Sequence, residues 1–190
     1  MHEIEPHYNW RQLYVAEEDP LSPFYGREYS EFELSQVIYN HYIHPQWDGF
    51  GSNTLYMKIL FVDYDKHFCI IELLGEWNDA IYNDVMYLYR NVIEDLIGND
   101  IKYFILIGEN ILEYHSDTTD YYEEWFDNLD GDGWIIGLNF REHVIREFTD
   151  TNIDYYLAFG GSFDEMTWRS LMPNQLFELV EKTITKRLEA

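Results

Sequence analysis

The acidic segment 109–132 contains the side chains whose types and spacing could do chemistry in this chain. Asn128, Asp130 and Asp132 alternate within it, which is the spacing of the first oxygen ligands in an EF-hand-type calcium loop. In that register Asn139 stands where the loop needs a bidentate Glu, so the main carboxylate ligand is missing. A helix-to-strand loop rich in Asp and Gly explains the same residues without a metal. We therefore keep these three residues as calcium candidates and predict no other metal site.

An imidazole, a hydroxyl and a carboxylate follow one another at His115, Ser116 and Asp117. Sequence neighbours do not generally form a catalytic triad, and the chain has no G-x-S-x-G nucleophile elbow. Glu109 follows an apolar run at a position where α/β sheets tend to bind ligands, although a polar residue is common in any such loop. We therefore predict no catalytic residue and no cofactor, and a non-enzyme is the preferred interpretation.

The pair His41-x-x-His44, followed by Asp48, has one of the spacings found in metal sites. Residues 36–44 are rich in β-branched and aromatic residues, which predicts a strand. Positions three apart on a strand face opposite sides, so the two imidazoles would diverge. We expect no metal ligation by this pair.

Charge is the strongest compositional signal, with 12 Lys and Arg residues against 36 Asp and Glu residues and a formal net charge of −24. DNA, RNA and anionic membranes are bound by neutralising phosphate with Lys and Arg, so this surface should repel them. We expect neither nucleic acid nor membrane partners. A basic protein partner and divalent cations are functional explanations of the charge, and solubility alone is the simplest one.

The compartment is predicted from three features of the chain. A single cysteine, Cys69, lies in an apolar run and excludes an internal disulfide framework, as in reducing compartments. The first residues show no basic and apolar pattern of a secretory signal. No apolar run approaches the roughly 20 residues that span a bilayer. We predict a cytoplasmic protein.

Hydrophobic periodicity predicts a mixed α/β fold, in which an antiparallel N-terminal hairpin or meander is followed by alternating α/β units on one mixed sheet. Strands are expected at 55–63 and 67–74, and one long helix from Asn78 to Ile97 with a core stripe that includes Ile81. The remaining expected elements are strands at 101–108, 134–138 and 152–159 and helices at 121–129, 141–149 and from 173 onward. Residues 11–15 read as a short strand, and a capping box at Ser30 to Glu33 allows a helix to begin there.

Residues 55–160 resemble the STAS domain, the anti-sigma-factor-antagonist type of fold. The resemblance rests on Gly75-Glu76 at the end of a hairpin strand, the long helix, the apolar strand at 104–107 and the segment 111–117. This last segment stands where the family places its phosphoacceptor, which implies Ser116 as a regulatory site flanked by His115 and Asp117. His115 replaces the family's Asp, however, and no Gly follows Ser116. A Ser that merely caps a loop is the alternative.

The chain is expected to form a single domain, 1–190, with an N-terminal extension at 1–54 that adds strands, a STAS-like core at 55–160 and a C-terminal loop and helix at 161–190. We predict a non-enzymatic protein that acts in protein–protein interaction or regulation, with an unidentified protein partner and a homodimer left open. The alternative is a carboxylate-based metal- or calcium-binding protein, or an enzyme, that uses the acidic 109–132 region.

Overall fold

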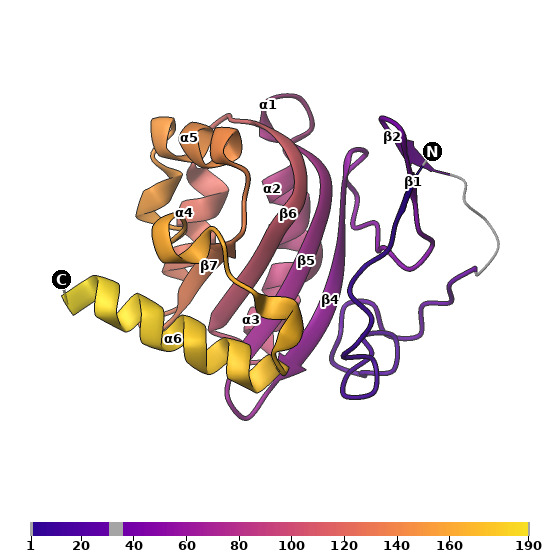
Figure 1. The fold of residues 1–190 in the computed structure, drawn as a ribbon, viewed down its shortest axis with the longest axis horizontal. Helices are drawn as coiled ribbons and strands as arrows, with labels where there is room; N and C mark the ends of the chain where they lie inside the picture. Colours follow the sequence, from indigo (N-terminus) through magenta and orange to yellow (C-terminus); the bar gives the residue numbers. More distant parts are fainter. Residues whose placement is uncertain (1, 31–35, 190) are drawn as a thin grey trace.

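A four-stranded sheet in the order β4-β5-β6-β7 forms the centre of the computed structural model, which describes residues 2–30 and 36–189 (Figure 1). β4 (Leu55–Asp63) and β5 (Phe68–Asn78) form the predicted antiparallel hairpin. β6 (Tyr103–His115) and β7 (Trp134–Leu138) continue the sheet parallel to β5. The predicted mixed α/β class is therefore confirmed.

Helices cover both faces of this sheet and bury two separate apolar cores (Figure 1). α6 (Pro173–Glu189) crosses one face, and its Leu176, Val180 and Ile184 are buried there as its predicted stripe requires, while Leu188 is exposed. In the described part of the chain, no helix is long and apolar enough to cross a membrane. The other face is covered by α2 (Asp84–Leu88), the π-helical turn η1 (Tyr89–Ile93), α3 (Glu94–Gly98), α4 (Asp120–Asp127) and α5 (Glu142–Asp150).

The helix predicted from Asn78 to Ile97 is interrupted after its first turn. Asn78 caps that turn as expected, but the turn, α1 (Asp79–Tyr82), ends at Asn83, whose φ of 53° is left-handed. The break rotates α1 away from the core, so Ile81 is 73% exposed although the periodicity assigns it to the buried stripe. The rest of that stripe is buried as predicted, at Val85, Leu88, Val92 and Leu96.

The strand predicted at 152–159 is wrong. Asn152 has a left-handed φ of 61°, and the chain then forms a 3₁₀ turn, η2 (Ile153–Tyr155). Only Ala158 reaches the sheet, through an isolated bridge to Ile136. Ile153 and Leu157 are buried four residues apart, so packing of a helical turn overrides the strand propensity of this aromatic run. Two further 3₁₀ turns follow, η3 (Gly161–Phe163) and η4 (Trp168–Ser170).

The N-terminal residues form a second, small sheet in the order β1-β3-β2. The single strand predicted at 36–44 is instead a hairpin of β2 (Val37–Ile38) and β3 (His41–Ile43), because Tyr39 turns the chain with a φ of 52°. β1 (His2–Ile4) pairs parallel with β3. Residues 11–15 form turns and the loop that follows them, not the expected strand, and most of the helix considered at Ser30 to Glu33 falls outside the described residues.

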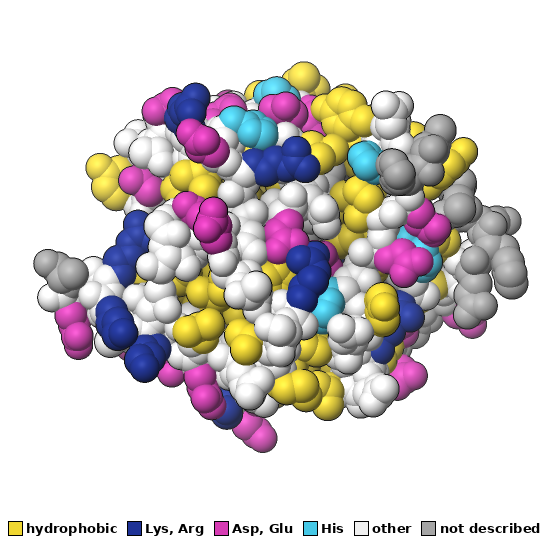
Figure 2. All heavy atoms as spheres, in the orientation of Figure 1, with side chains coloured by type: hydrophobic (Ala, Val, Ile, Leu, Met, Phe, Trp, Pro, Cys, Tyr) yellow, Lys and Arg dark blue, Asp and Glu magenta, His cyan; other side chains and the backbone are white. Residues whose placement is uncertain are grey.

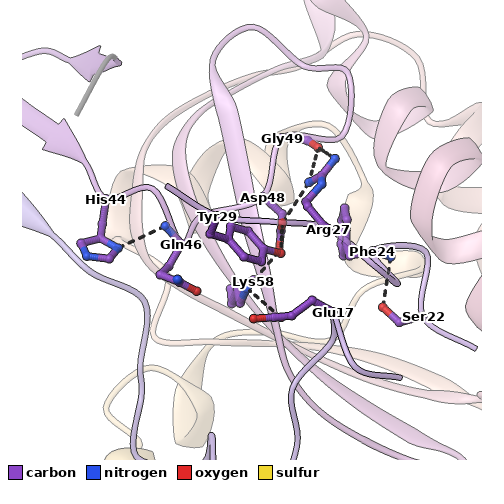
Figure 3. Close-up of polar contacts among 10 residues, drawn as sticks. All are labelled: Glu17, Ser22, Phe24, Arg27, Tyr29, His44, Gln46, Asp48, Gly49 and Lys58. Carbon is purple, nitrogen blue, oxygen red and sulfur yellow. Dashed lines mark hydrogen bonds and ion pairs between the residues drawn. The ribbon is translucent and has the colours of Figure 1, made fainter. Parts of the chain in front are cut away.

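A buried ion network holds the N-terminal region against the edge strand β4 (Figure 3). Asp48 is fully buried and pairs with Met57 of β4 through two backbone hydrogen bonds of 2.7 and 3.0 Å. The Lys58 ammonium lies 3.3 Å from Asp48 and 3.6 Å from Glu17. Arg27 adds an ion pair of 2.9 Å to Asp48. Asp48, supported by Glu17 and Arg27, thus covers part of the sheet edge that β4 would otherwise leave open.

Candidate functional site

The carboxyl ends of β5 and β6 meet at one edge of the sheet, next to α1 (Figure 1). Gly75 near the end of β5 has a φ of 123°, and a Cβ there would lie 2.1 Å from the Thr54 carbonyl oxygen. This glycine therefore allows the close approach in which the Glu76 amide donates to Thr54 at 3.0 Å. The chain then turns into α1 and presents two aspartates at this edge.

Asp79 is 2% exposed, and donors of the protein itself occupy both of its carboxylate oxygens. Oδ1 accepts from the Val85 amide at 2.8 Å and from the Trp77 indole at 3.1 Å. Oδ2 accepts from the hydroxyls of Tyr122 at 2.6 Å and Tyr114 at 3.2 Å. Desolvation nevertheless raises the pKa of Asp79 to about 6, because all four donors are neutral groups.

Asp84 is fully buried on the other side of the α1 turn. Its Oδ2 accepts from the Asn78 amide at 2.8 Å and from the Thr54 hydroxyl at 3.3 Å. Burial raises the pKa of Asp84, and the Ser52 hydroxyl and these two donors lower it in part. The negative charge of Asp84 also contributes to the raised pKa of Asp79.

A more exposed layer lies beside these aspartates and centres on the Glu76 carboxylate. Its oxygens accept from Asn78 Nδ2 at 3.0 Å and from the Tyr39 hydroxyl at 3.3 Å, and His115 Nε2 lies 3.3 Å away. Asn78 in turn accepts the Ile81 amide at 2.9 Å, so contacts run continuously from the β2–β3 turn to α1. We call the following residues the strand-end surface: Tyr39, Glu76, Ile81, Tyr82 and His115.

The predicted regulatory residues lie next to this surface. β6 extends to His115, so the strand predicted at 101–108 continues well into the segment 111–117. The half-buried Ser116 donates its amide to Glu147 of α5 at 3.3 Å, whereas Asp117 is exposed. Among the residues that the structure describes, no hydrogen bond or ion pair joins the side chains of these three neighbours. They therefore do not form a nucleophile with its base.

One of the three calcium candidates, Asn128, already has a side-chain partner in the protein. Asn128 Nδ2 donates to the Tyr89 hydroxyl at 2.5 Å, and Asp130 sits exposed in a turn with a φ of 54°. Asn139, at the register position of the missing bidentate ligand, donates instead to Glu109 at 2.8 Å. Calcium binding through Asn128, Asp130 and Asp132 stays a prediction.

Glu109 contributes to a second polar cluster, on the sheet face that α6 crosses. It accepts from the Trp168 indole at 2.7 Å and forms an ion pair with Arg169. Arg169 also lies 3.7 Å from Glu72, a β5 carboxylate that is 1% exposed. Desolvation raises the pKa of Glu72 to about 7, whereas hydrogen bonds from Asn139, Arg169 and Trp168 lower the pKa of Glu109 despite its partial burial. Both carboxylates are thus engaged in holding η4 on the sheet.

Within the described residues, one group of three metal-type ligands comes together, and the sequence did not indicate it. It consists of Glu3, Glu5 and His44, with His44 Nε2 lying 3.7 Å from an oxygen of each glutamate. The Gln46 amide donates to His44 Nδ1 at 3.1 Å. An imidazole that accepts at Nδ1 carries its proton on Nε2, so Nε2 faces the glutamates as a donor and not as a metal ligand.

Sequence reasoning missed Asp79 and Asp84 because one continuous helix from Asn78 to Ile97 leaves both outside its predicted core stripe. A usable signal is the repeated Asn-Asp at 78–79 and 83–84. Asn favours both caps and left-handed turns, so two such pairs five residues apart indicate a capped turn followed by a new helix.

Comparison with known proteins gives a likeness in fold. No protein-family model matches the chain, and no curated protein matches it. A structure of the anti-sigma factor antagonist SpoIIAA in its unphosphorylated form is similar, with 15% identity over 56% of this chain and 89% of that one and a TM-score of 0.43. The phosphorylated form of the Bacillus cell fate determinant SpoIIAA matches with 16% identity over 56% of this chain and 92% of that one, at a TM-score of 0.40. The predicted resemblance was to the anti-sigma-factor-antagonist type of fold, and SpoIIAA is an anti-sigma factor antagonist.

Proposed function

We propose that this chain is a protein-interaction module that binds a basic partner protein at the strand-end surface and turns over no substrate. One observation supports this most directly. The carboxyl ends of parallel strands are where α/β proteins usually bind small ligands, yet the aspartates there are buried and hydrogen-bonded to the protein's own donors. What this edge offers to solvent is the apolar Ile81, two tyrosines and the Glu76–His115 pair.

The charge of the chain supports a basic partner. No Lys or Arg occurs between Lys66 and Arg90 or between Lys102 and Arg141, and these two stretches supply β5, α1, β6 and α4. A surface with this excess of carboxylates attracts Lys- and Arg-rich proteins over about a Debye length and increases their rate of association. The divalent-cation alternative has less support, because the group of three metal-type ligands within the described residues lies at Glu3, Glu5 and His44 and not in the acidic 109–132 region.

Affinity capture followed by reconstitution tests the proposal. We expect a protein with a basic surface to be enriched from native cells and, once purified, to bind at least about tenfold more weakly at about 0.5 M than at about 0.1 M NaCl. Glu76→Gln should weaken binding, whereas Glu181→Gln, which removes an exposed charge on α6, should not. Salt-independent binding, or the same affinity for both variants, would contradict the proposed surface.

Modification of Ser116 is the regulatory part of the proposal. Ser116 follows β6 directly beside His115, and its amide already contacts the carboxylate of Glu147. A phosphate there would add about two negative charges next to Glu147 and change the binding of the partner at the strand-end surface. We expect intact-protein mass spectrometry of material from native cells to show one added phosphate group that disappears in Ser116→Ala. An unmodified Ser116 in those cells would remove regulation but leave the interaction.

A further inference from the structure

The α1 turn carries the most exposed apolar side chain at this edge of the molecule. Ile81 is 73% exposed and Tyr82 is 38% exposed. Figure 1 shows α1 and its connecting loop projecting beyond the ends of β5 and β6. In Figure 2 hydrophobic side chains are exposed beside acidic and histidine side chains along that upper edge. Single exposed apolar residues are ordinary, so exposure alone assigns no role.

The turn is held in one conformation from both sides. The Asn78 side chain accepts the Ile81 amide at 2.9 Å, and the Asn83 amide donates to the Asp79 carbonyl at 3.1 Å. Asn83 adopts a left-handed conformation that is uncommon for a residue other than glycine. The two flanking aspartates are buried, which is unfavourable without a cation and persists only where the surroundings demand it. A turn fixed in this way presents its apolar tip with little conformational entropy left to lose on binding.

We infer, resting on the proposed function, that the α1 turn inserts Ile81 into an apolar pocket of the partner protein and that Lys and Arg residues surround that pocket. Interfaces draw most of their affinity from a few side chains that enter desolvated pockets, with polar contacts around them. Ile81 is such a tip, and Glu76 lies beside it through the shared contact with Asn78. Two cations lie at α5, which packs next to β6: Arg141 directly precedes the helix and Arg146 lies within it. Arg146 is paired with Glu142, so these two residues do not cancel the excess of carboxylates around the α1 turn.

Charge decides between a partner protein and a second copy of this chain. Two copies would each bring a net charge of −24 and the same acidic edge, so their association through this surface is opposed electrostatically. A pocket with a basic rim satisfies both the apolar tip and the surrounding carboxylates.

The experiment measures affinity for the purified partner with two matched variants. A photo-crosslinking amino acid at position 82 identifies the protein in contact with the turn, which is then purified and titrated by calorimetry. We expect Ile81→Ser to weaken binding by about 30-fold or more, as for a truncated central contact. Leu188→Ser is the control, because Leu188 is also aliphatic, is 80% exposed and lies at the end of α6, far from α1 (Figure 1). It should change affinity by no more than about twofold.

Each outcome supports or overturns the inference, and capture alone does not count as support. A purified partner that binds Ile81→Ser as tightly as the unmodified chain overturns the role of the α1 turn and leaves the proposed function intact. Crosslinking to a second copy of the chain overturns the choice of partner. Failure to find any partner overturns both. Circular dichroism confirms that the two variants, both at exposed positions, are folded.

Discussion

Two regions of this molecule bury aspartates and provide them with different partners. Asp48 in the N-terminal region lies between two cations, Lys58 at 3.3 Å and Arg27 at 2.9 Å (Figure 3). Asp79 and Asp84 at the strand ends are buried to the same degree, but hydroxyl, amide and indole groups are their hydrogen-bond donors.

The difference indicates different roles for the two regions. An ion pair in a low-dielectric interior resists the loss of either partner, so the Asp48 network is suited to holding the N-terminal region on β4. Buried carboxylates without a cation are costly in their charged form, and the pKa of Asp79 is accordingly raised to about 6. The strand-end region therefore responds to protonation near physiological pH, and it is also the region that positions Ile81.

Removing the buried cation of the N-terminal network, Lys58, should have the largest effect. Lys58→Met keeps the side chain's length but leaves the buried Asp48 and the partly buried Glu17 without their shared ammonium group, so that Arg27 is the remaining cation at Asp48. We expect the free energy of unfolding to fall by about 3–5 kcal/mol, measured by urea denaturation. Lys66→Met is the control, because Lys66 is about half exposed and 3.8 Å from an exposed Glu178, and it should cost less than about 0.5 kcal/mol. Similar losses in both variants would mean that burial of the network adds nothing.

For the strand-end region, we expect the free energy of unfolding to depend on pH. Because the pKa of Asp79 is raised from 3.8 to about 6, the folded state holds a proton between these values that the unfolded state has released. The stability from this proton is fully present below about pH 4 and is lost as the pH rises through 6, an effect of about 3 kcal/mol. Asp79→Asn should remove this share of the slope in urea denaturation series from pH 4 to 7.5.

The slope of the unmodified chain will include other groups, so the comparison must be made between variants. Asp84 and Glu72 also have raised pKa values, Glu72 to about 7, so the stability that each contributes to the fold is likewise lost as the pH rises. Asp95→Asn, at an exposed position on α3, should leave the slope unchanged. If Asp79→Asn behaves like Asp95→Asn, the carboxylate at position 79 is solvated in solution and the contrast between the two regions disappears.

Local sequence patterns predicted most of the sheet but little of what distinguishes these two regions. The hairpin, the limits of β7 and the buried stripe from Val85 to Leu96 follow from periods of two and 3.6 residues. Asp79 accepts hydrogen bonds from Tyr114 and Tyr122, which are 35 and 43 residues away along the chain. Such partners leave no periodic signal, so the burial of Asp79 was missed. The helix break and the exposure of Ile81 had a local signal in the Asn-Asp pairs at 78–79 and 83–84, which hydrophobic periodicity does not register.

The N-terminal network also could not be predicted from local sequence patterns. Lys58 was assigned correctly to a strand, but its ion pairs reach Glu17 across a loop region in which turns replace the expected strand at 11–15. Strand alternation places Lys58 on a face of the sheet and gives no indication that Asp48 will cover it. Sequence thus predicted the strands of the central sheet and most of its helices, while the pairing of buried charges required the tertiary fold.

A matched pair of tyrosine substitutions should give the smallest and most discriminating effect. Tyr122 donates its hydroxyl to Asp79 at 2.6 Å, and Tyr29 donates to Asp48 at 2.5 Å. Tyr122→Phe should cost about 2 kcal/mol and raise the pKa of Asp79 further, because the charged carboxylate loses one of four neutral donors. Tyr29→Phe should cost less than about 1 kcal/mol, because Arg27 and Lys58 still face Asp48. Urea denaturation at pH 7.5 measures both losses, and equal losses would show that the cations in the first region do no more for a buried carboxylate than the neutral donors in the second.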